Sequence, residues 1–346
     1  TALLVIALAK RKELNMDYRA AAAAAIIGMG ATWALGISSS AAQLQANKSS
    51  LPESLYHLTG VIPFSETIFL PQSMIMTLVL TIVSILIAFW SAPKGNAIKT
   101  IDAFDEKPTD DFLESKSVNK RPGDWLENSP ILTILIVILG LVWMFNEFGK
   151  SNPILAISSL NTYNFIFLML GLALHGTPRN FLNAVSKAVP AISGVLIQFP
   201  LYGSIAFILT HAVNSQDFSL SHYIAEFFVS IASKETFAVI MGIYSAILGF
   251  FIPSGGGKWI IEAPYVMQAA HDLKYHLGWS VQIYNAAEAL PNLINPFFML
   301  PMLGILKLKP KDVIGFTVTQ LIVHFPLVLF LLWILGRTLA YTPPVF

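Results

Sequence analysis

Long apolar stretches alternate with short polar ones along the chain. Two apolar runs, 67–90 and 313–335, are long enough to cross the hydrocarbon core of a bilayer, which takes about 20 helical residues. Other apolar stretches are interrupted by glycine, serine or proline. Lipid offers no hydrogen-bond partner to a free N–H or C=O, so an irregular segment at membrane depth must be satisfied by protein, water or a ligand. The pattern predicts an all-α polytopic membrane protein with discontinuous helices.

Two interruptions and one hinge shape this prediction. Residues 249–259 read GFFIPSGGGKW, which predicts a helix broken at 252–258. Residues 33–43 read WALGISSSAAQ and predict a similar break at 36–41. Two short apolar pieces meet at the polar sequence SKET, residues 233–236, and predict a re-entrant hairpin over 222–252.

The features around the two breaks recur in the same order. Each break is followed by a His-Leu pair, a glutamate, a Leu-Pro pair and a strong span: His57, Glu66, Pro71 and 67–90 in the first half, and His276, Glu288, Pro291 and 313–335 in the second. The two spans are expected to run in opposite directions. We therefore predict inverted repeats, which in secondary transporters place paired broken helices at a binding site near the membrane midplane.

The repeats also predict the domain organisation. Residues 1–91 form the C-terminal part of the first repeat, 92–129 a linker, and 130–346 the second repeat. The first repeat lacks counterparts of the opening helices of the second, so we expect an N-terminally truncated chain. The linker is the one long hydrophilic segment, and its lysines and arginines predict a cytoplasmic location.

Composition excludes several classes of protein. Of the 346 residues, 55% are hydrophobic and only 12% are charged, too few to cover a soluble protein of this size. There is no cysteine, so disulfides, thiolate catalysis and Cys-ligated metals are excluded. The net charge is +1 with no basic stripe, which gives no support to nucleic-acid binding. The histidines are isolated and no G-x-S-x-G motif occurs, so we predict no metal, no cofactor and no catalytic residue.

The two breaks are the candidate binding sites. A helix that restarts exposes unpaired N–H groups and a partial positive charge, which suit an anion. The predicted anion ligands are the hydroxyls and small residues of the breaks: Ser38, Ser39, Ser40, Ser254, Gly255, Gly256 and Gly257. Carbonyls that end the preceding half-helices could instead hold a coupling cation, at Gly36, Ile37 and Ile252, together with Asn292. The alternative is close helix packing through small residues.

Charged and amide side chains near the breaks have two interpretations each. Lys258 either binds the anion or extends its ammonium group to the membrane interface. The three glutamates Glu66, Glu262 and Glu288 either relay protons or fix the breaks by hydrogen bonds. Asn292 and Asn295, which lie among prolines, either pair with freed backbone groups or line the substrate path.

Several motifs together resemble one family. GISSSAA at 36–42, PRN at 178–180, QFPLYG at 198–203 and FIPSGGGKW at 251–259 are similar to the short-chain fatty acid transporter family of the ion transporter superfamily. The resemblance covers essentially the whole chain. It implies inner-membrane symport of short-chain carboxylates such as acetoacetate or butyrate, driven by an ion, through an elevator motion in a homodimer. It also adds Ser233 and Thr236, at the hairpin tip, to the binding residues, whereas Lys258 departs from the glutamine more often expected there.

Alternatives to this reading remain. An intramembrane lipid-modifying enzyme, with Glu288 or His276 as catalytic residue, would need polar groups converging from unrelated segments. A channel is disfavoured because no span carries a continuous polar stripe. The coupling ion is either Na⁺ or H⁺, and the scarcity of acidic and histidine residues within the spans favours Na⁺.

Overall fold

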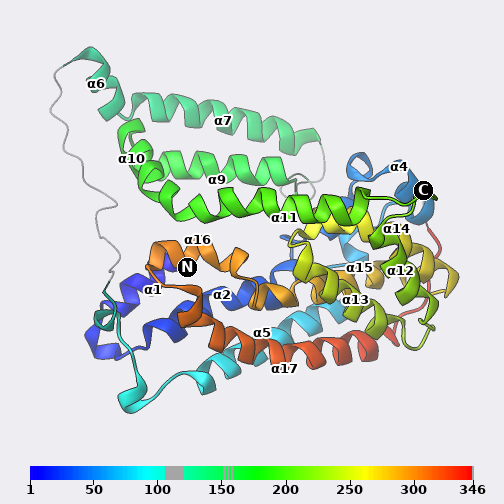
Figure 1. Ribbon diagram of the computed structural model, residues 1–346. Helices are drawn as coiled ribbons and strands as arrows, with labels where there is room; N and C mark the ends of the chain where they lie inside the picture. Colours follow the sequence, from blue (N-terminus) through cyan, green and yellow to red (C-terminus); the bar gives the residue numbers. More distant parts are fainter. Residues whose placement is uncertain (106–120, 151–152, 154–155, 157–158, 345–346) are drawn as a thin grey trace. The chain divides into compact units, whose positions relative to one another are not determined.

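The computed structural model describes residues 1–105, 121–150, 153, 156 and 159–344 (Figure 1). Within these ranges every regular element is helical, and the one β contact is an isolated bridge between Val213 and Ser219. In the part of the chain that the structure describes, four segments are long and apolar enough to cross a membrane: Tyr18–Ala46, Pro71–Ser91, Ile131–Lys150 and Pro310–Gly336. A bent pair, Leu277–Leu293 with Pro296–Leu306, makes a fifth. The all-α polytopic prediction is confirmed at this level.

The described residues fall into two compact units. Unit 2, Pro108–Ser193, contains α6 (Pro122–Asn128), α7 (Ile131–Lys150), α9 (Leu160–His175) and α10 (Pro178–Ala188). Its helices α7 and α9 pack through an edge contact of Trp143 on Phe165, with ring centroids 4.7 Å apart, and through Gly140 against Met169. The middle of the predicted linker, 106–120, lies outside the described residues.

Unit 1, Thr1–Lys107 with Gly194–Phe346, contains both predicted breaks. Its helices are α1 (Ala2–Ala9), α2 (Tyr18–Ala31), α3 (Ser40–Ala46), α4 (Glu53–Thr59), α5 (Pro71–Ser91), α11 (Ser193–His211), α12 (Leu220–Ser230), α13 (Phe237–Phe251), α14 (Gly255–Asp272), α15 (Leu277–Glu288), α16 (Pro296–Leu306) and α17 (Pro310–Gly336). Short 3₁₀ turns follow α2, as η2 (Trp33–Leu35), and α15, as η8 (Leu290–Leu293).

The centre of unit 1 is helix α15, all twelve residues of which are buried. It packs against α13, α14 and α17. Small residues allow this packing: a Cβ on Gly249 of α13 would lie 2.9 Å from the carbonyl oxygen of Glu288. Backbones that approach so closely leave no room for a side chain, as is common between membrane helices.

Helices α5 and α17 lie side by side and run antiparallel (Figure 1). Gln72 near the start of α5 donates to Thr338 just beyond α17, at 2.9 Å, while Ser84 pairs with His324 at 2.9 Å midway along both. On α5 the buried face carries Ser73 and Ser84, whereas the exposed face is apolar. Polar groups inside and apolar groups outside are what a lipid environment favours.

Both breaks exist, but their limits differ from those predicted. The first break covers Gly36–Ser39 and the second Ile252–Ser254, because α3 begins at Ser40 and α14 at Gly255. The three glycines therefore form the first turn of α14 and do not lie in the break itself. The predicted span 67–90 is shifted to Pro71–Ser91 because Pro71, which lacks an N–H, opens the helix.

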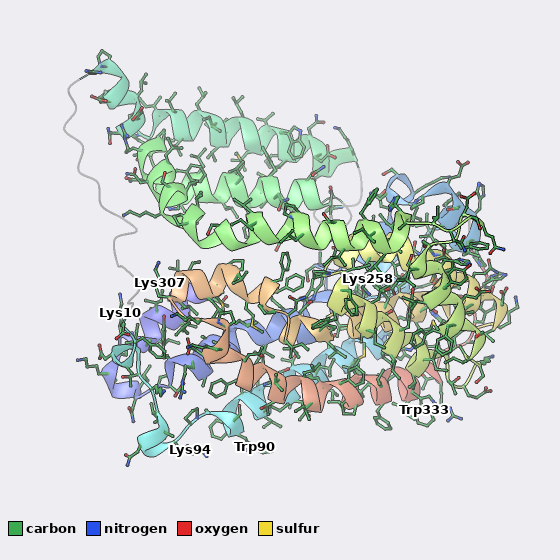
Figure 2. The ribbon with its side chains drawn as sticks, in the orientation of Figure 1. Lys10, Trp90, Lys94, Lys258, Lys307 and Trp333 are labelled. Carbon is green, nitrogen blue, oxygen red and sulfur yellow. The ribbon has the colours of Figure 1, made fainter. Side chains whose placement is uncertain are left out.

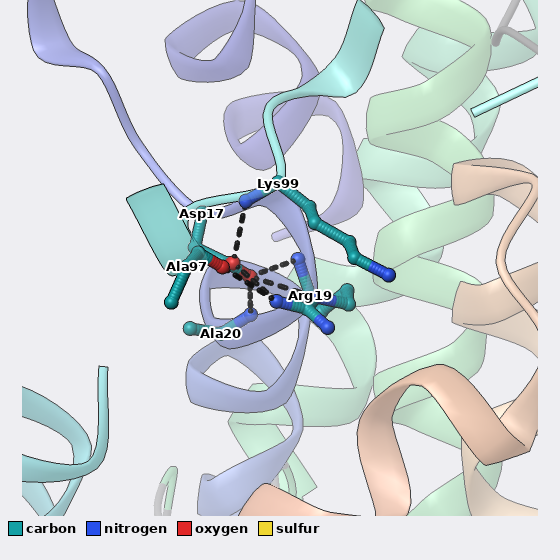
Figure 3. A network of polar contacts seen from close by, with 5 residues as sticks. All are labelled: Asp17, Arg19, Ala20, Ala97 and Lys99. Atoms are coloured by element: carbon teal, nitrogen blue, oxygen red, sulfur yellow. Dashed lines mark hydrogen bonds and ion pairs between the residues drawn. The ribbon is translucent and has the colours of Figure 1, made fainter. Parts of the chain in front are cut away.

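The start of α2 is fixed by one carboxylate (Figure 3). Asp17 accepts hydrogen bonds from the backbone amides of Arg19 and Ala20, both at 3.0 Å, and from that of Lys99 at 2.9 Å. The Arg19 guanidinium adds a 2.7 Å ion pair. Burial alone would raise the pKa of the Asp17 carboxyl, but the hydrogen bonds and the Arg19 charge outweigh burial and bring the pKa below its ordinary value of 3.8.

Replacing Asp17 by alanine is expected to destabilise the protein by about 1–2 kcal/mol at pH 7, because α2 loses its N-cap. The folded-state pKa lies below the unfolded one, so this contribution is complete above pH 3.8 and is lost as the pH falls through the folded-state value. Unfolding in detergent at several pH values measures the difference. A difference between wild type and D17A that shrinks between pH 7 and pH 5 would contradict the assignment.

Candidate functional site

The two breaks, distant in sequence, meet in unit 1. An ideal Cβ on Gly255 would lie 2.7 Å from Cη2 of Trp33, and one on Gly256 would lie 3.2 Å from Cβ of Ser40. Trp33 and Ser40 flank the first break, and the glycines follow the second. We call this contact the crossing. It places side by side the two elements that the sequence predicted to form one site.

The helix that leads to the first break ends beside α5. Thr32, at the end of α2, lines the same cleft as Thr81 and Ser84, which lie in the middle of α5. Because α5 is a candidate membrane span, the approach to the first break lies within the length of that span. Unsatisfied backbone groups are costly in such surroundings.

Matching serines start the helices that follow the breaks. Ser39 Oγ accepts from the amide of Ala42 at 3.1 Å, and Ser254 Oγ accepts from the amide of Gly257 at 3.3 Å. Within the described residues, the amides of Gly255 and Gly256 have no hydrogen-bond partner. The first turn of α14 thus keeps two free donors and the partial positive charge of a helix N-terminus.

Two asparagines pair with the ends of the helices that precede the breaks. Asn292 Nδ2 donates to the carbonyl of Met29 in α2 at 3.1 Å, and Asn295 Nδ2 donates to that of Phe250 in α13 at 3.4 Å. These carbonyls belong to the last turns of α2 and α13, where no following helical amide donates to them. Of the two interpretations of the asparagines, the structure thus shows pairing with freed backbone groups.

The carbonyls predicted to hold a cation each accept a hydrogen bond. Gly36 accepts from the amide of Ser39 at 2.9 Å, Ile37 from Gln43 Nε2 at 2.6 Å, and Ile252 from the amide of Ser254 at 2.8 Å. A carbonyl oxygen has a second lone pair. Their role as cation ligands, with Asn292, stays a prediction.

A buried chain of polar side chains extends from the first break. Ser39 donates to Asn285 at 2.9 Å, Asn285 donates to Gln282 at 2.6 Å, and Gln282 donates to Ser73 of α5 at 2.7 Å. None of these four side chains is more than 1% exposed. Asn285, Gln282 and Ser73 were not predicted, because their partners lie far away in sequence.

Lys258 is fully buried and fully paired. Its Nζ lies 2.8 Å from Oε1 of Glu262 and 3.0 Å from the carbonyl of Ser245, and 4.3 Å from the ring centroid of Tyr284. The side chain is 0% exposed, so the interpretation in which the ammonium group reaches the membrane interface is wrong. Glu262 is fixed in turn by a 2.8 Å hydrogen bond from Ser245 Oγ.

The predicted hairpin tip lies apart from the crossing. Ser233 and Thr236 bind each other: the amide of Ser233 donates to Thr236 Oγ1 at 2.9 Å, and the amide of Thr236 donates to Ser233 Oγ at 3.3 Å. The tip precedes α13 and the second break follows it. At 1.5 Å per residue, that 15-residue helix separates them by about 22 Å.

Comparison with known proteins identifies the family of the chain. Residues 1–335 match the family described as "Short chain fatty acid transporter". The chain belongs to this family. Two relatives carry the name "Putative short-chain fatty acid transporter": one from Escherichia coli strain K12 is 34% identical over 90% of this chain and 68% of its own length, and one from Haemophilus influenzae is 32% identical over 92% and 70%.

Membership of the short-chain fatty acid transporter family confirms the predicted resemblance. The family and both relatives are named as transporters, which decides against the alternative of a lipid-modifying enzyme. No solved structure matches the chain significantly.

The Lys258–Glu262 pair yields a stability test. Lys258→Met would leave the Glu262 carboxylate buried without its counter-charge, which costs about 3–5 kcal/mol. In K258M/E262Q both charges are gone, so most of the loss should be recovered. Unfolding in detergent measures all variants, with Lys234→Met, at the exposed tip, as the lysine control expected to stay within about 0.5 kcal/mol of wild type. A K258M protein as stable as wild type would refute the structural role.

Proposed function

We propose that this protein is a secondary transporter that carries short-chain monocarboxylates, such as butyrate or acetoacetate, and binds their carboxylate at the crossing. The observation that carries the proposal is the contact between the two breaks, with the free first amides of α14 beside it. The names of the relatives supply the class of substrate. The remaining support comes from the chemistry of the crossing.

The crossing offers donors suited to a carboxylate. The amides of Gly255 and Gly256 point out of the N-terminus of α14, and the hydroxyls of Ser40 and Ser254 flank them. Ser38 also lies in the first break, with its hydroxyl donating to the carbonyl of Trp33. Backbone amides at a helix N-terminus bind anions without a cationic side chain. Lys258, already paired with Glu262, is therefore not needed as a direct ligand.

Several features support inverted repeats. The breaks have matching serine caps and matching asparagine contacts, and the spans α5 and α17 are antiparallel. In Figure 2, Lys10, Lys94 and Lys307 lie toward one end of unit 1 and Trp333 toward the other. Positive residues mark the cytoplasmic side, so we assign that end, and the linker that follows Lys94, to the cytoplasm of an inner-membrane protein. The re-entrant hairpin, the elevator motion and the homodimer stay predictions from the resemblance.

Gly256→Val tests the location of the site. Its side chain would extend from a point 3.2 Å from Ser40 Cβ and 3.7 Å from Leu44 Cδ1, and so would force the two breaks apart. We expect the affinity for butyrate to fall about tenfold or more, which is about 1.4 kcal/mol of binding free energy. Binding to the purified protein and uptake into proteoliposomes measure the effect.

Gly315→Val is the matched control. Gly315 lies on α17, and no atom comes within 4 Å of a Cβ placed there. Binding and uptake should match those of wild type. Unchanged butyrate binding in a folded G256V protein would exclude the crossing as the substrate site.

A further inference from the structure

One carboxyl at the crossing has a free oxygen. Glu288, the last residue of α15, is 2% exposed, and its Oε1 has no hydrogen-bond partner among the described residues. The same oxygen lies 3.1 Å from the ideal Cβ position of Gly255. Because glycine has no Cβ, the first residue of α14 can pack directly against this carboxyl. A larger residue there would displace either Glu288 or Trp33.

The surrounding free groups are donors. The indole nitrogen of Trp33 is also buried without a partner, and Trp33 Cζ2 lies 3.4 Å from the same Cβ position. Together with the amides of Gly255 and Gly256, the crossing thus contains three N–H groups without a partner and one free acceptor among the described residues. Each buried polar group left unpaired costs about 1–3 kcal/mol, so a ligand that pairs with them gains binding energy. Donors and a helix N-terminus favour an anion over Na⁺.

The charged neighbours do not neutralise Glu288. On α14, the Lys258 ammonium is already bound to Glu262 at 2.8 Å, so this pair contributes no net charge. On α15, the Tyr284 hydroxyl donates to the carbonyl of Gly255 at 2.6 Å, and on α13 the buried Tyr244 hydroxyl adds no charge. On η2, Trp33 offers only its N–H. The positive end of α14 is thus the main partner available to a negative charge here.

Two negative charges cannot share this place cheaply. A substrate carboxylate bound to the first amides of α14 would lie against Glu288, and like charges at close range in a low-dielectric site repel strongly. Protonation of Glu288 removes the repulsion and turns Oε1 or Oε2 into a hydrogen-bond donor to the substrate.

We propose that Glu288 binds the coupling proton, so that the crossing holds one negative charge at a time; this rests on the proposed function. In the empty site the charge is the Glu288 carboxylate beside the N-terminus of α14. In the loaded site one proton is bound to Glu288 and the charge is the substrate carboxylate. One proton and one monocarboxylate anion enter together and leave together, so the step moves no net charge and breaks no other bond.

Butyrate binding to the purified protein tests the coupling, by calorimetry in Na⁺-free buffers of different ionisation enthalpy. Wild type should take up about one proton per butyrate where Glu288 is ionised when empty, and its affinity should fall about tenfold per pH unit in that range. Glu288→Gln, whose amide resembles the protonated acid, should bind butyrate without proton uptake and independently of pH. Glu288→Asp should keep the proton uptake.

Glu53→Gln is the carboxyl control, because Glu53 lies on α4 and its side chain is 89% exposed. It should behave as wild type. Infrared difference spectra supply a readout that does not need the glutamine variant to fold: butyrate should produce the C=O band of a protonated carboxylic acid in wild type, shifted in E288D.

The outcomes separate the two proposals. No butyrate binding by wild type under any condition would refute the proposed function. Binding that requires Na⁺, takes up no proton or gives no protonated-acid band would overturn the role of Glu288 and leave the carboxylate site in place. Proton uptake that persists in E288Q would overturn it too.

Discussion

The structure of unit 1 depends on one constraint, which is that helices broken in apolar surroundings must have their freed backbone groups satisfied by other parts of the protein or by a ligand. On the N-terminal side of each following helix a serine, Ser39 or Ser254, caps one amide, and the amides of Gly255 and Gly256 keep no partner among the described residues. The C-terminal sides are met from a distance, by Asn292 and Asn295, which reach the last turns of α2 and α13. One short segment, η8 with the start of α16, therefore serves both breaks.

The same constraint explains why the most deeply buried helix is rich in polar residues. Helix α15 carries the polar residues Gln282, Asn285 and Glu288, and all three are buried inside the protein, away from lipid. Asn285 and Gln282 connect Ser39 to Ser73 through three consecutive hydrogen bonds. Such a network has fixed geometry, so it holds the first break in register against α15. Glu288, one turn further along α15, lies outside the network and keeps a free oxygen.

The breaks could be predicted because their signals are local. Runs of Gly, Ser and Pro interrupt an apolar stretch wherever they occur, and the order of features in the two halves indicated that the breaks would meet. Their limits were harder to predict, since three glycines favour a loop, whereas the Ser254 cap and the packing against Trp33 and Ser40 make them a helical turn. Contacts such as Ser39 with Asn285 leave no local signal across 246 residues. The Lys258–Glu262 pair did have one, a spacing of four, but the predicted break at 252–258 placed Lys258 outside the helix that carries Glu262.

That spacing also bears on how the chain enters the membrane during synthesis. A lone lysine or acidic residue at the centre of a helix raises its insertion free energy by roughly 2.5–3.5 kcal/mol. Lys258 and Glu262 lie one turn apart on α14, so they can neutralise each other as soon as that helix forms, before α15 has been synthesised. A pair contributed by two different helices would remain uncompensated until both had been inserted. In α14 the two charges can therefore compensate each other within a single helix, without a charged residue from another helix.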